Sequence, residues 1–286
     1  MQKRPPSIPR RSNLRNSAGL AENNTAGSRS ASILDYYLAL LRRWGPQNWW
    51  PAQSRFEVIV GAYLTQNTNW LNVEKAMANL RKERALSPRA IRELSLERLQ
   101  ELIRSSGYYR QKAIKLKVFV EYLDQKYAGS LDRMFAQPTA QLRNELLALK
   151  GVGPETADSI LLYAGNHPVF VVDAYTRRIL ERHGLITAAT KYEEIRALME
   201  NAISSATPDS HTTTAIANDP RHKPSRISRM RRTELAQHYN ELHALIVRAG
   251  NQFCRSSPLC MSCPLHPFLS SPLKQQPSTE TNRNSS

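Results

Sequence analysis

Cysteine, acidic residues and long apolar runs are all scarce in this sequence, and each shortage excludes a class of protein. Only 3 of the 286 residues are Cys, and they cluster near the C-terminus, unlike the disulfide framework of a small secreted domain. No apolar run approaches the roughly 18 residues that a transmembrane helix needs. The N-terminus also lacks the apolar core of a secretory signal. We therefore expect a protein of the reducing cytoplasm that does not act at a membrane.

The shortage of acids leaves a strong positive charge. Lys and Arg total 40 against 24 Asp and Glu, which gives a formal net charge of +16. Such a surplus suits a polyanionic partner, because each neutralised phosphate releases condensed counterions. A merely solvated basic surface would have the same composition. Of the possible partners, nucleic acid is the one that this charge favours.

The ends of the chain differ in composition from its centre. Residues 1–32 carry six Lys or Arg and one Glu without periodic apolar residues, which predicts a disordered basic N-terminal tail. Residues 269–286 are rich in Ser, Pro, Gln and Asn and predict a second disordered tail. Between the tails, residues 33–268 repeat apolar side chains at helical spacing, and strand signals are few. The central domain is therefore predicted to be all-α.

A basic segment, residues 207–232, interrupts the helical pattern. It contains six Lys or Arg, two Asp and three Pro. A loop of this length is unusual in a compact domain. Two interpretations stay open, a solvated disordered insertion and an arm that contacts DNA.

The stretch LKGVGPETA, residues 149–157, predicts a tight hairpin between two helices. Gly151 and Gly153 permit a sharp reversal of the chain, Val152 can anchor the turn in the core, and Pro154 can open the next helix. The first N–H groups of that helix lack helical partners and suit a phosphate. A purely structural turn is the alternative.

Further motifs identify this hairpin with a known family. LKGVGPETADSILLYA resembles the helix-hairpin-helix of the endonuclease III superfamily of DNA glycosylases, and GYYRQKAIKL and VGAYLTQNT resemble other segments of that family. The resemblance covers roughly residues 33–264, apart from residues 207–232. It implies an all-α, two-lobed helix-hairpin-helix glycosylase fold with the active site in the cleft between the lobes. It also implies that the hairpin binds DNA through Gly151, Val152, Gly153 and Thr156.

Asp173 lies 20 residues after Gly153, in VFVVDAYTRRI, at the position of the family's catalytic carboxylate. Cleavage of an N-glycosidic bond develops positive charge on the sugar, which an ionised carboxylate stabilises. The same group can orient or deprotonate the attacking water. Asp173 is also well placed to cap the following helix, and the two roles are compatible.

Glu155 occupies the hairpin position at which the strand-cleaving members of the family carry a lysine. The amine of that lysine attacks the sugar and forms a Schiff base, which a carboxylate cannot do. Lys150 lies on the other side of the turn. The sequence therefore predicts a monofunctional glycosylase with water as nucleophile, although Glu155 could be only a first-turn acid favoured by the helix dipole.

Three of the four tryptophans, Trp49, Trp50 and Trp70, fall within one short region. Aromatic faces attract cations, and an alkylated purine such as 3-methyladenine carries a positive charge. Together with WWP, LTQNT and the hairpin, these residues resemble the 3-methyladenine branch of the superfamily, which also has Glu at the position of Glu155. Gln66 resembles the residue that fills the gap left by the flipped base. Ordinary core packing of the tryptophans, and a buried amide at Gln66, are the alternatives.

Cys254, Cys260 and Cys263 follow a C-x5-C-x2-C pattern. It is similar to the [4Fe–4S] loop of endonuclease III relatives, but the first spacing is one residue short and Leu269 stands at the fourth ligand position. His266 could complete a Cys3His set for iron or zinc. A [4Fe–4S] cluster with an incomplete Cys set, a zinc ion and a decayed site without metal all stay open.

The combined prediction is a base excision repair glycosylase that flips an alkylated purine out of double-stranded DNA and hydrolyses its glycosidic bond. We expect it to act as a monomer on DNA that contains a damaged base. One alternative is a glycosylase for oxidised pyrimidines or mismatches. Another is a non-catalytic DNA-binding protein that uses the hairpin as a clamp, which would leave Asp173 and the tryptophans without a purpose.

Overall fold

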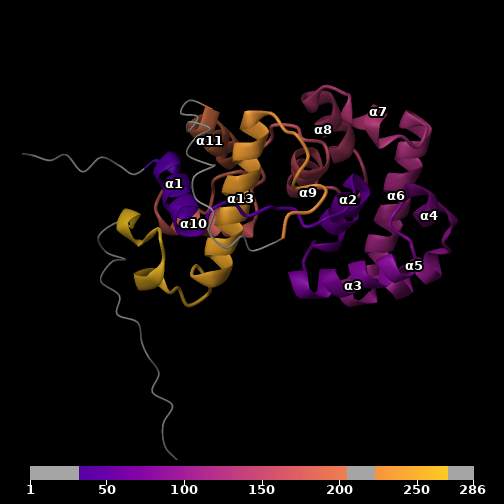
Figure 1. The fold of residues 1–286 in the computed structure, drawn as a ribbon, viewed down its shortest axis with the longest axis horizontal. Helices are drawn as coiled ribbons and strands as arrows, with labels where there is room; N and C mark the ends of the chain where they lie inside the picture. The colour runs from indigo at the N-terminus through magenta and orange to yellow at the C-terminus, as the bar shows by residue number, and fades with distance from the viewer. Residues whose placement is uncertain (1–31, 205–222, 270–286) are drawn as a thin grey trace, which may run out of the picture. The chain divides into compact units, whose positions relative to one another are not determined.

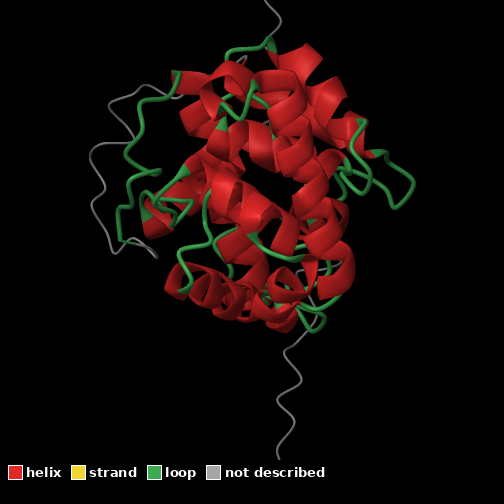
Figure 2. Ribbon diagram, turned by 90° about the vertical axis from the view of Figure 1, so that its right-hand side faces the viewer, coloured by secondary structure: helices red, strands yellow, loops and turns green. Residues whose placement is uncertain are grey.

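A computed structural model describes residues 32–204 and 223–269 of the chain. Within these ranges all regular secondary structure is helical (Figure 2), which confirms the all-α prediction. No helix in the described ranges is both long enough and apolar enough to span a bilayer. The segments predicted as tails lie outside the described residues, except for Ser32 and Leu269.

Most of the longer helices begin at a side chain that caps them. The capping oxygen accepts a hydrogen bond from a backbone N–H that has no partner inside the helix. Residues that cap in this way are Ser32, Ser54, Asn69, Ser87, Ser95, Ser130, Asp173 and Thr233. The start of each of these helices is therefore indicated by a single residue in the local sequence.

Contacts between helices divide the folded part into two lobes (Figure 1). The terminal lobe combines the first helix with the C-terminal ones, and in it α13 packs against α1, α10 and α11. Its elements are α1 (Ile33–Trp44), α10 (Ala174–Arg182), α11 (Tyr192–Ser204), α13 (Glu234–Gln252) and the short 3-10 turns η3 (Cys260–Ser262) and η4 (His266–Phe268).

The hairpin lobe is formed by the middle of the chain. Its elements are α2 (Arg55–Leu64), α3 (Trp70–Lys82), α4 (Pro88–Glu93), α5 (Leu96–Leu102), η1 (Arg104–Ser106), α6 (Tyr109–Tyr127), α7 (Leu131–Phe135), α8 (Thr139–Leu147), α9 (Pro154–Ser159) and the π-helical turn η2 (Ile160–Ala164). The lobes meet where η2 packs against α13. The chain thus leaves the terminal lobe after α1 and returns to it through residues 169–173, immediately before α10.

One buried lysine fastens three elements of the hairpin lobe together. The Lys112 Nζ on α6 donates to the carbonyl oxygens of Leu64 (2.8 Å) and Ser106 (2.6 Å), at the ends of α2 and η1. Desolvation, followed by the charge of Lys115, lowers the pKa of Lys112 to about 8. These bonds fix the start of the loop that carries Gln66.

Candidate active site

Asp173 stands where the chain re-enters the terminal lobe. The four residues before it, Val169 to Val172, are buried and have no regular structure. Asp173 is the N-cap of α10, and its Oδ1 accepts from the Thr176 backbone N (2.7 Å) and from Thr176 Oγ1 (2.8 Å). Only 13% of its side chain is exposed. The cap uses one carboxylate oxygen and leaves Oδ2 available for other contacts.

Side chains of α11 hold the apolar segment before Asp173. The Phe170 backbone N donates to Glu200 (2.9 Å) and the Val172 N donates to the hydroxyl of Tyr192 (3.3 Å). Tyr192 in turn donates to Asp158 of α9 (2.9 Å). These side-chain bonds satisfy backbone N–H groups of an extended segment that has no neighbouring strand in the described part of the chain. Through Tyr192 and Asp158 they also link this segment to α9, the second helix of the hairpin.

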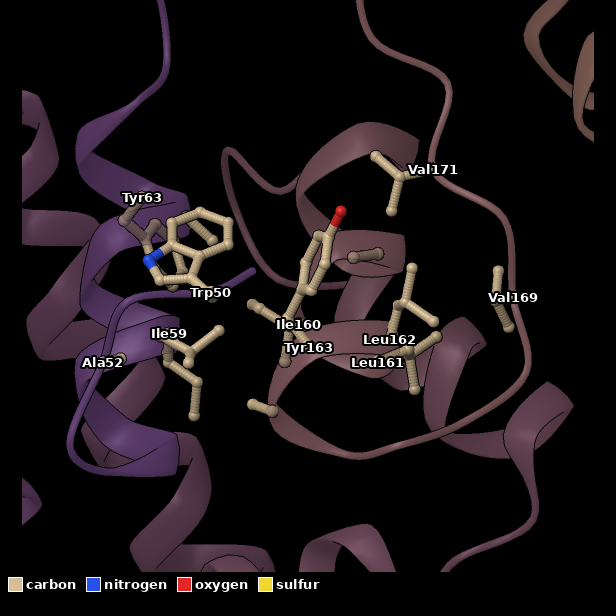
Figure 3. Packing of buried hydrophobic residues seen from close by; sticks show 14 of the residues in the cluster. Trp50, Ala52, Ile59, Tyr63, Ile160, Leu161, Leu162, Tyr163, Val169 and Val171 are labelled. Atoms are coloured by element: carbon tan, nitrogen blue, oxygen red, sulfur yellow. The ribbon is translucent and has the colours of Figure 1, made fainter. Parts of the chain in front are cut away.

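The predicted tryptophans form a single aromatic cluster. The ring centroids of Trp49, Trp50 and Trp70 lie 5.1–5.5 Å from one another. Trp50 also lies edge-on to Tyr163 of η2, with 5.2 Å between the ring centroids, and Figure 3 shows these two rings next to each other. A Cβ at Gly61 would come within 2.9 Å of the Trp50 ring. The missing side chain of Gly61 therefore leaves room for Trp50 to pack against α2. Trp50 is buried, whereas Trp49 and Trp70 are partly exposed.

Glu155 is the second residue of α9, and the charge of Asp173 acts on its carboxylate. Desolvation and then the negative charge of Asp173 raise its pKa from an ordinary 4.5 to about 7. The residue as a whole is exposed, so solvent also reaches its carboxylate. The structure therefore places Glu155 within reach of the charge of Asp173.

Gln66 is bound to the hairpin from across the lobe. Its Nε2 donates to Thr156 Oγ1 (2.9 Å) and to the Gly151 carbonyl (3.2 Å), while its Oε1 accepts from Lys115 Nζ (2.6 Å). Gly151 has a positive φ of 82°, and a Cβ there would lie 2.3 Å from Lys115. Entry of Gln66 into a duplex would require these three bonds to break.

The turn itself has a buried side and an open side. Val152 is buried beneath the turn, as its predicted anchoring role requires. Gly153, the N-cap of α9, is exposed, and a Cβ added to it would meet no atom within 4 Å. The open side can therefore approach another molecule closely.

The three cysteines line one pocket of the terminal lobe, together with His183, His266 and Leu269 among others. Among the described residues, however, no group of three or more His, Cys, Asp or Glu side chains is placed to hold a metal ion. Leu269, at the fourth ligand position, is buried and apolar.

The surroundings of the thiols differ from one another. Burial raises the pKa of Cys263 to about 11. Cys254 Sγ instead accepts a hydrogen bond from Arg182 (3.2 Å). The loop as folded does not fit the four-thiolate cluster of endonuclease III relatives.

Part of the predicted insertion packs onto the aromatic cluster. Residues 207–222 lie outside the described ranges, but residues 223–232 are described. Ser225 Oγ donates to the Trp50 carbonyl (2.9 Å) and the Ile227 N donates to the Ala52 carbonyl (3.2 Å). Arg232 folds back and donates to the Ile227 carbonyl (3.0 Å). This part of the segment therefore supports the loop that carries the tryptophans.

Two buried residues near Asp173 were not predicted as site residues: Tyr163, at the end of the hairpin motif, and His243, which lies in no motif. Tyr163 of η2 is hydrogen-bonded to Nδ1 of His243 on α13, and the other ring nitrogen of His243 lies 3.7 Å from Asp173 Oδ2. The sequence contains one weak signal for His243, because its helical spacing places it on the same buried face of α13 as Tyr239, Leu242 and Ile246. Such a position indicates burial and says nothing about the partner.

Comparison with known proteins agrees with this geometry. The sequence profile of the HhH-GPD superfamily, described as base excision DNA repair proteins, matches residues 60–205. A protein of Methanocaldococcus jannaschii, provisionally named a DNA repair glycosylase, is 41% identical over 238 residues, which span 82% of this chain and 94% of the relative. Endonuclease III of Thermotoga maritima is 34% identical over 143 residues, or 50% of this chain and 63% of the relative.

Solved structures show the same fold. The 3-methyladenine DNA glycosylase of H. pylori (MagIII), solved with 1,N6-ethenoadenine, matches with a TM-score of 0.62 and 28% identity, over 78% of this chain and 98% of that one. An endonuclease III bound non-covalently to DNA matches with a TM-score of 0.62 over 84% of this chain and 94% of that one, at 23% identity. The two-lobed fold predicted from the hairpin is therefore confirmed.

Proposed function

The chain belongs to the HhH-GPD superfamily of base excision DNA repair proteins, and from this premise we propose that it is a monofunctional DNA glycosylase for alkylated purines such as 3-methyladenine. Its substrate is double-stranded DNA with a damaged base, and it acts as a monomer. The observation that carries the proposal is the placement of Asp173. It is a nearly buried carboxylate whose Oδ2 lies outside the helix cap, and its charge acts on Glu155 of the hairpin and on Tyr163, the ring that contacts Trp50.

Asp173 supplies the electrostatic part of the reaction. As the glycosidic bond breaks, the sugar becomes cationic, and a fixed carboxylate in a partly desolvated site stabilises that charge. The same carboxylate orients the water that completes the hydrolysis. The cap contacts to Thr176 hold the carboxylate in place beforehand, so little reorganisation is needed.

Glu155 supports hydrolysis without strand cleavage. Imine formation requires an uncharged amine aimed at the sugar, and the hairpin presents a carboxylate at this position. Lys150 is exposed on the approach to the turn, on the side away from α9. Water is then the nucleophile, and the product is an intact abasic strand.

The aromatic cluster supports an alkylated purine as the base that is bound. A cation over a Trp face gains about 0.5–2 kcal/mol, and Trp49 and Trp70 of the cluster are partly exposed. An alkylated, cationic purine is also a good leaving group, so modest catalysis suffices. The 28% identity to the H. pylori 3-methyladenine glycosylase points the same way.

A second candidate is a glycosylase for oxidised pyrimidines or mismatches. The 34% identity to endonuclease III of T. maritima over half of this chain favours it. Such an enzyme would share the hairpin and Asp173 but would need no cation-binding pocket. A non-catalytic hairpin protein has less support, because it gives the nearly buried carboxylate of Asp173 no chemical task.

A substrate panel tests these candidates directly. Duplexes that carry an alkylated purine, an oxidised pyrimidine or a mismatch are incubated with the protein, and each sample is run with and without alkali. We expect base release from the alkylated purine, with strand breaks only after alkali and no covalent complex trapped by borohydride. Release of oxidised pyrimidines instead would transfer support to the second candidate, and borohydride trapping would overturn the monofunctional assignment.

A further inference from the structure

Tyr163 and His243 form a buried pair behind Asp173. The Tyr163 hydroxyl and His243 Nδ1 are in hydrogen-bond contact, and both residues lie in the core where η2 packs on α13. His243 is only 6% exposed. Its Nε2 has no hydrogen-bond partner among the described residues and lies 3.7 Å from Asp173 Oδ2.

The buried contact fixes which nitrogen carries the proton. A fully buried tyrosine hydroxyl must donate to an acceptor, and Nδ1 is the acceptor that it touches. An imidazole that accepts at Nδ1 and is neutral carries its proton at Nε2. Burial lowers the pKa of His243, with only a smaller opposing effect from Asp173, which agrees with a neutral ring. The pair therefore directs an N–H toward Asp173.

Few other groups surround this ring. The Phe170 ring lies edge-on to it, 6.1 Å between centroids, and is apolar. Besides Asp173, the charges that act on Tyr163 are those of Glu241 and Arg232. Asp173 is thus the acceptor toward which the Nε2–H can turn.

We propose, on the basis of the glycosylase function above, that His243 is a positioning residue for Asp173 and that Tyr163 sets its tautomer. The two oxygens of the Asp173 carboxylate have different neighbours. Oδ1 of Asp173 is held by Thr176 at the cap, and the Nε2–H of His243 approaches one lone pair of Oδ2, which fixes the plane of the carboxylate and leaves the second lone pair of Oδ2 for the water or the sugar. The separation of 3.7 Å is longer than a hydrogen bond, as catalytic contacts in the absence of substrate often are, and it shortens when the damaged base is bound.

Two substitutions at His243 separate the functions of its two nitrogens. The amide of His243→Asn can replace Nδ1 opposite Tyr163 but cannot reach Asp173, whereas His243→Gln can place an amide N–H near the position of Nε2. We expect single-turnover base release to fall about 10- to 100-fold in His243→Asn, the value of a hydrogen bond to a charged group. His243→Gln should recover most of the rate, and DNA affinity should be unchanged in both.

The same helix offers a matched control. His238 is also buried on α13, and its Nδ1 is hydrogen-bonded to the Tyr37 hydroxyl (3.1 Å). Its Nε2 lies 3.8 Å from the Glu234 carboxylate. This second Tyr–His pair has the same form but does not contact Asp173. His238→Asn should therefore change the melting temperature about as much as His243→Asn does, and leave base release near the wild-type rate.

A double-mutant cycle decides whether His243 acts through Asp173. In an Asp173→Asn background, His243→Asn should cause no further loss, because the charge that it positions is gone. Tyr163→Phe, a second route if His243→Asn does not fold, should cause a smaller loss that also vanishes in that background. Equal losses in both backgrounds, or no loss from either substitution, would overturn the inference. Full activity of Asp173→Asn alone would instead overturn the proposed function.

Discussion

At the scale of single residues, Asp173 combines structural and chemical roles that substitution can separate. Asn keeps an oxygen that can accept from the Thr176 N–H but carries no charge, while Ala loses both. We expect Asp173→Asn to melt near the wild-type temperature and to release the base about 10²–10³ times more slowly. Asp173→Ala should show the same slow release and lose about 0.5–2 kcal/mol of stability with the cap. Thermal melts and single-turnover assays measure the two effects, and normal release by Asp173→Asn would contradict the proposed role.

Glu155 gives a prediction about pH. Its pKa in the folded protein is raised from 4.5 to about 7, so the folded state binds the proton more tightly than the unfolded state does. The stability that this group contributes is present below pH 4.5 and is lost as the pH rises through 7. Glu155→Gln stays neutral throughout, so it should match wild type near pH 4.5 and melt at a higher temperature at pH 8. The gain should be small because the residue is exposed, and a lower melting temperature at pH 8 would contradict the shift.

Individual residues also show how far sequence reasoning reaches. Asp173, Glu155 and the tryptophans were predictable because motifs of a few residues contain them. The Tyr163–His243 pair was not, since it joins positions 80 residues apart and depends on how η2 packs on α13. The sequence likewise did not reveal that all polar atoms of the Gln66 amide are engaged by the hairpin and Lys115.

At the scale of elements, the two hairpin glycines should differ in what they do. A side chain at Gly151 would be strained by the positive φ and would displace the end of the Lys115 side chain, whereas Gly153 has open space. Gly151→Ala should therefore destabilise the fold, while Gly153→Ala should fold normally and weaken DNA binding by restricting phosphate approach. Melting and equilibrium binding to undamaged duplex measure the two outcomes. Unchanged affinity in a folded Gly153→Ala variant would remove this side of the turn from the interface.

The cysteine loop gives a prediction about metal content. With the buried, apolar Leu269 at the fourth ligand position, a full cluster lacks one of its four ligands. We expect protein purified without oxygen to contain well below four iron and four sulfide per chain, and a chelator to leave its melting temperature unchanged. Stoichiometric iron and sulfide would show that the loop rearranges around a cluster.

The helices were more predictable than the segments between them. Ser caps and apolar spacing mark most helix starts, including Ser32 before α1 and Ser95 before α5. Residues 55–64 fitted a helix or a strand, because a fully buried element shows no polar face, and only tertiary packing decides. The π-helical turn η2 and the extended segment before Asp173 depend on contacts with α13 and α11, which no local pattern records.

At the scale of the whole molecule, the path of the chain explains where the site lies. The hairpin lobe is an excursion between α1 and α10, so the segment that ends at Asp173 crosses from one lobe to the other. Residues 223–232 make a second crossing, from the Trp50 loop to α13. Groups from both lobes therefore converge at Asp173, and a base held there would contact residues far apart in sequence.

The net charge of +16 gives the last prediction, which concerns the whole surface. Only charges that meet phosphates release counterions, and each contact adds about −0.9 to the slope of log affinity against log salt concentration. Lys150 is exposed beside the hairpin turn, so Lys150→Gln should reduce the magnitude of the slope by about 0.9. Lys126 is a suitable control, because it is paired with Glu145 (2.8 Å) and lies about 16 Å along α6 from Lys115. Lys126→Gln should leave the slope unchanged although it removes the same charge. If both variants lowered the slope equally, diffuse charge rather than the hairpin would attract DNA, and the interface would have to be placed elsewhere.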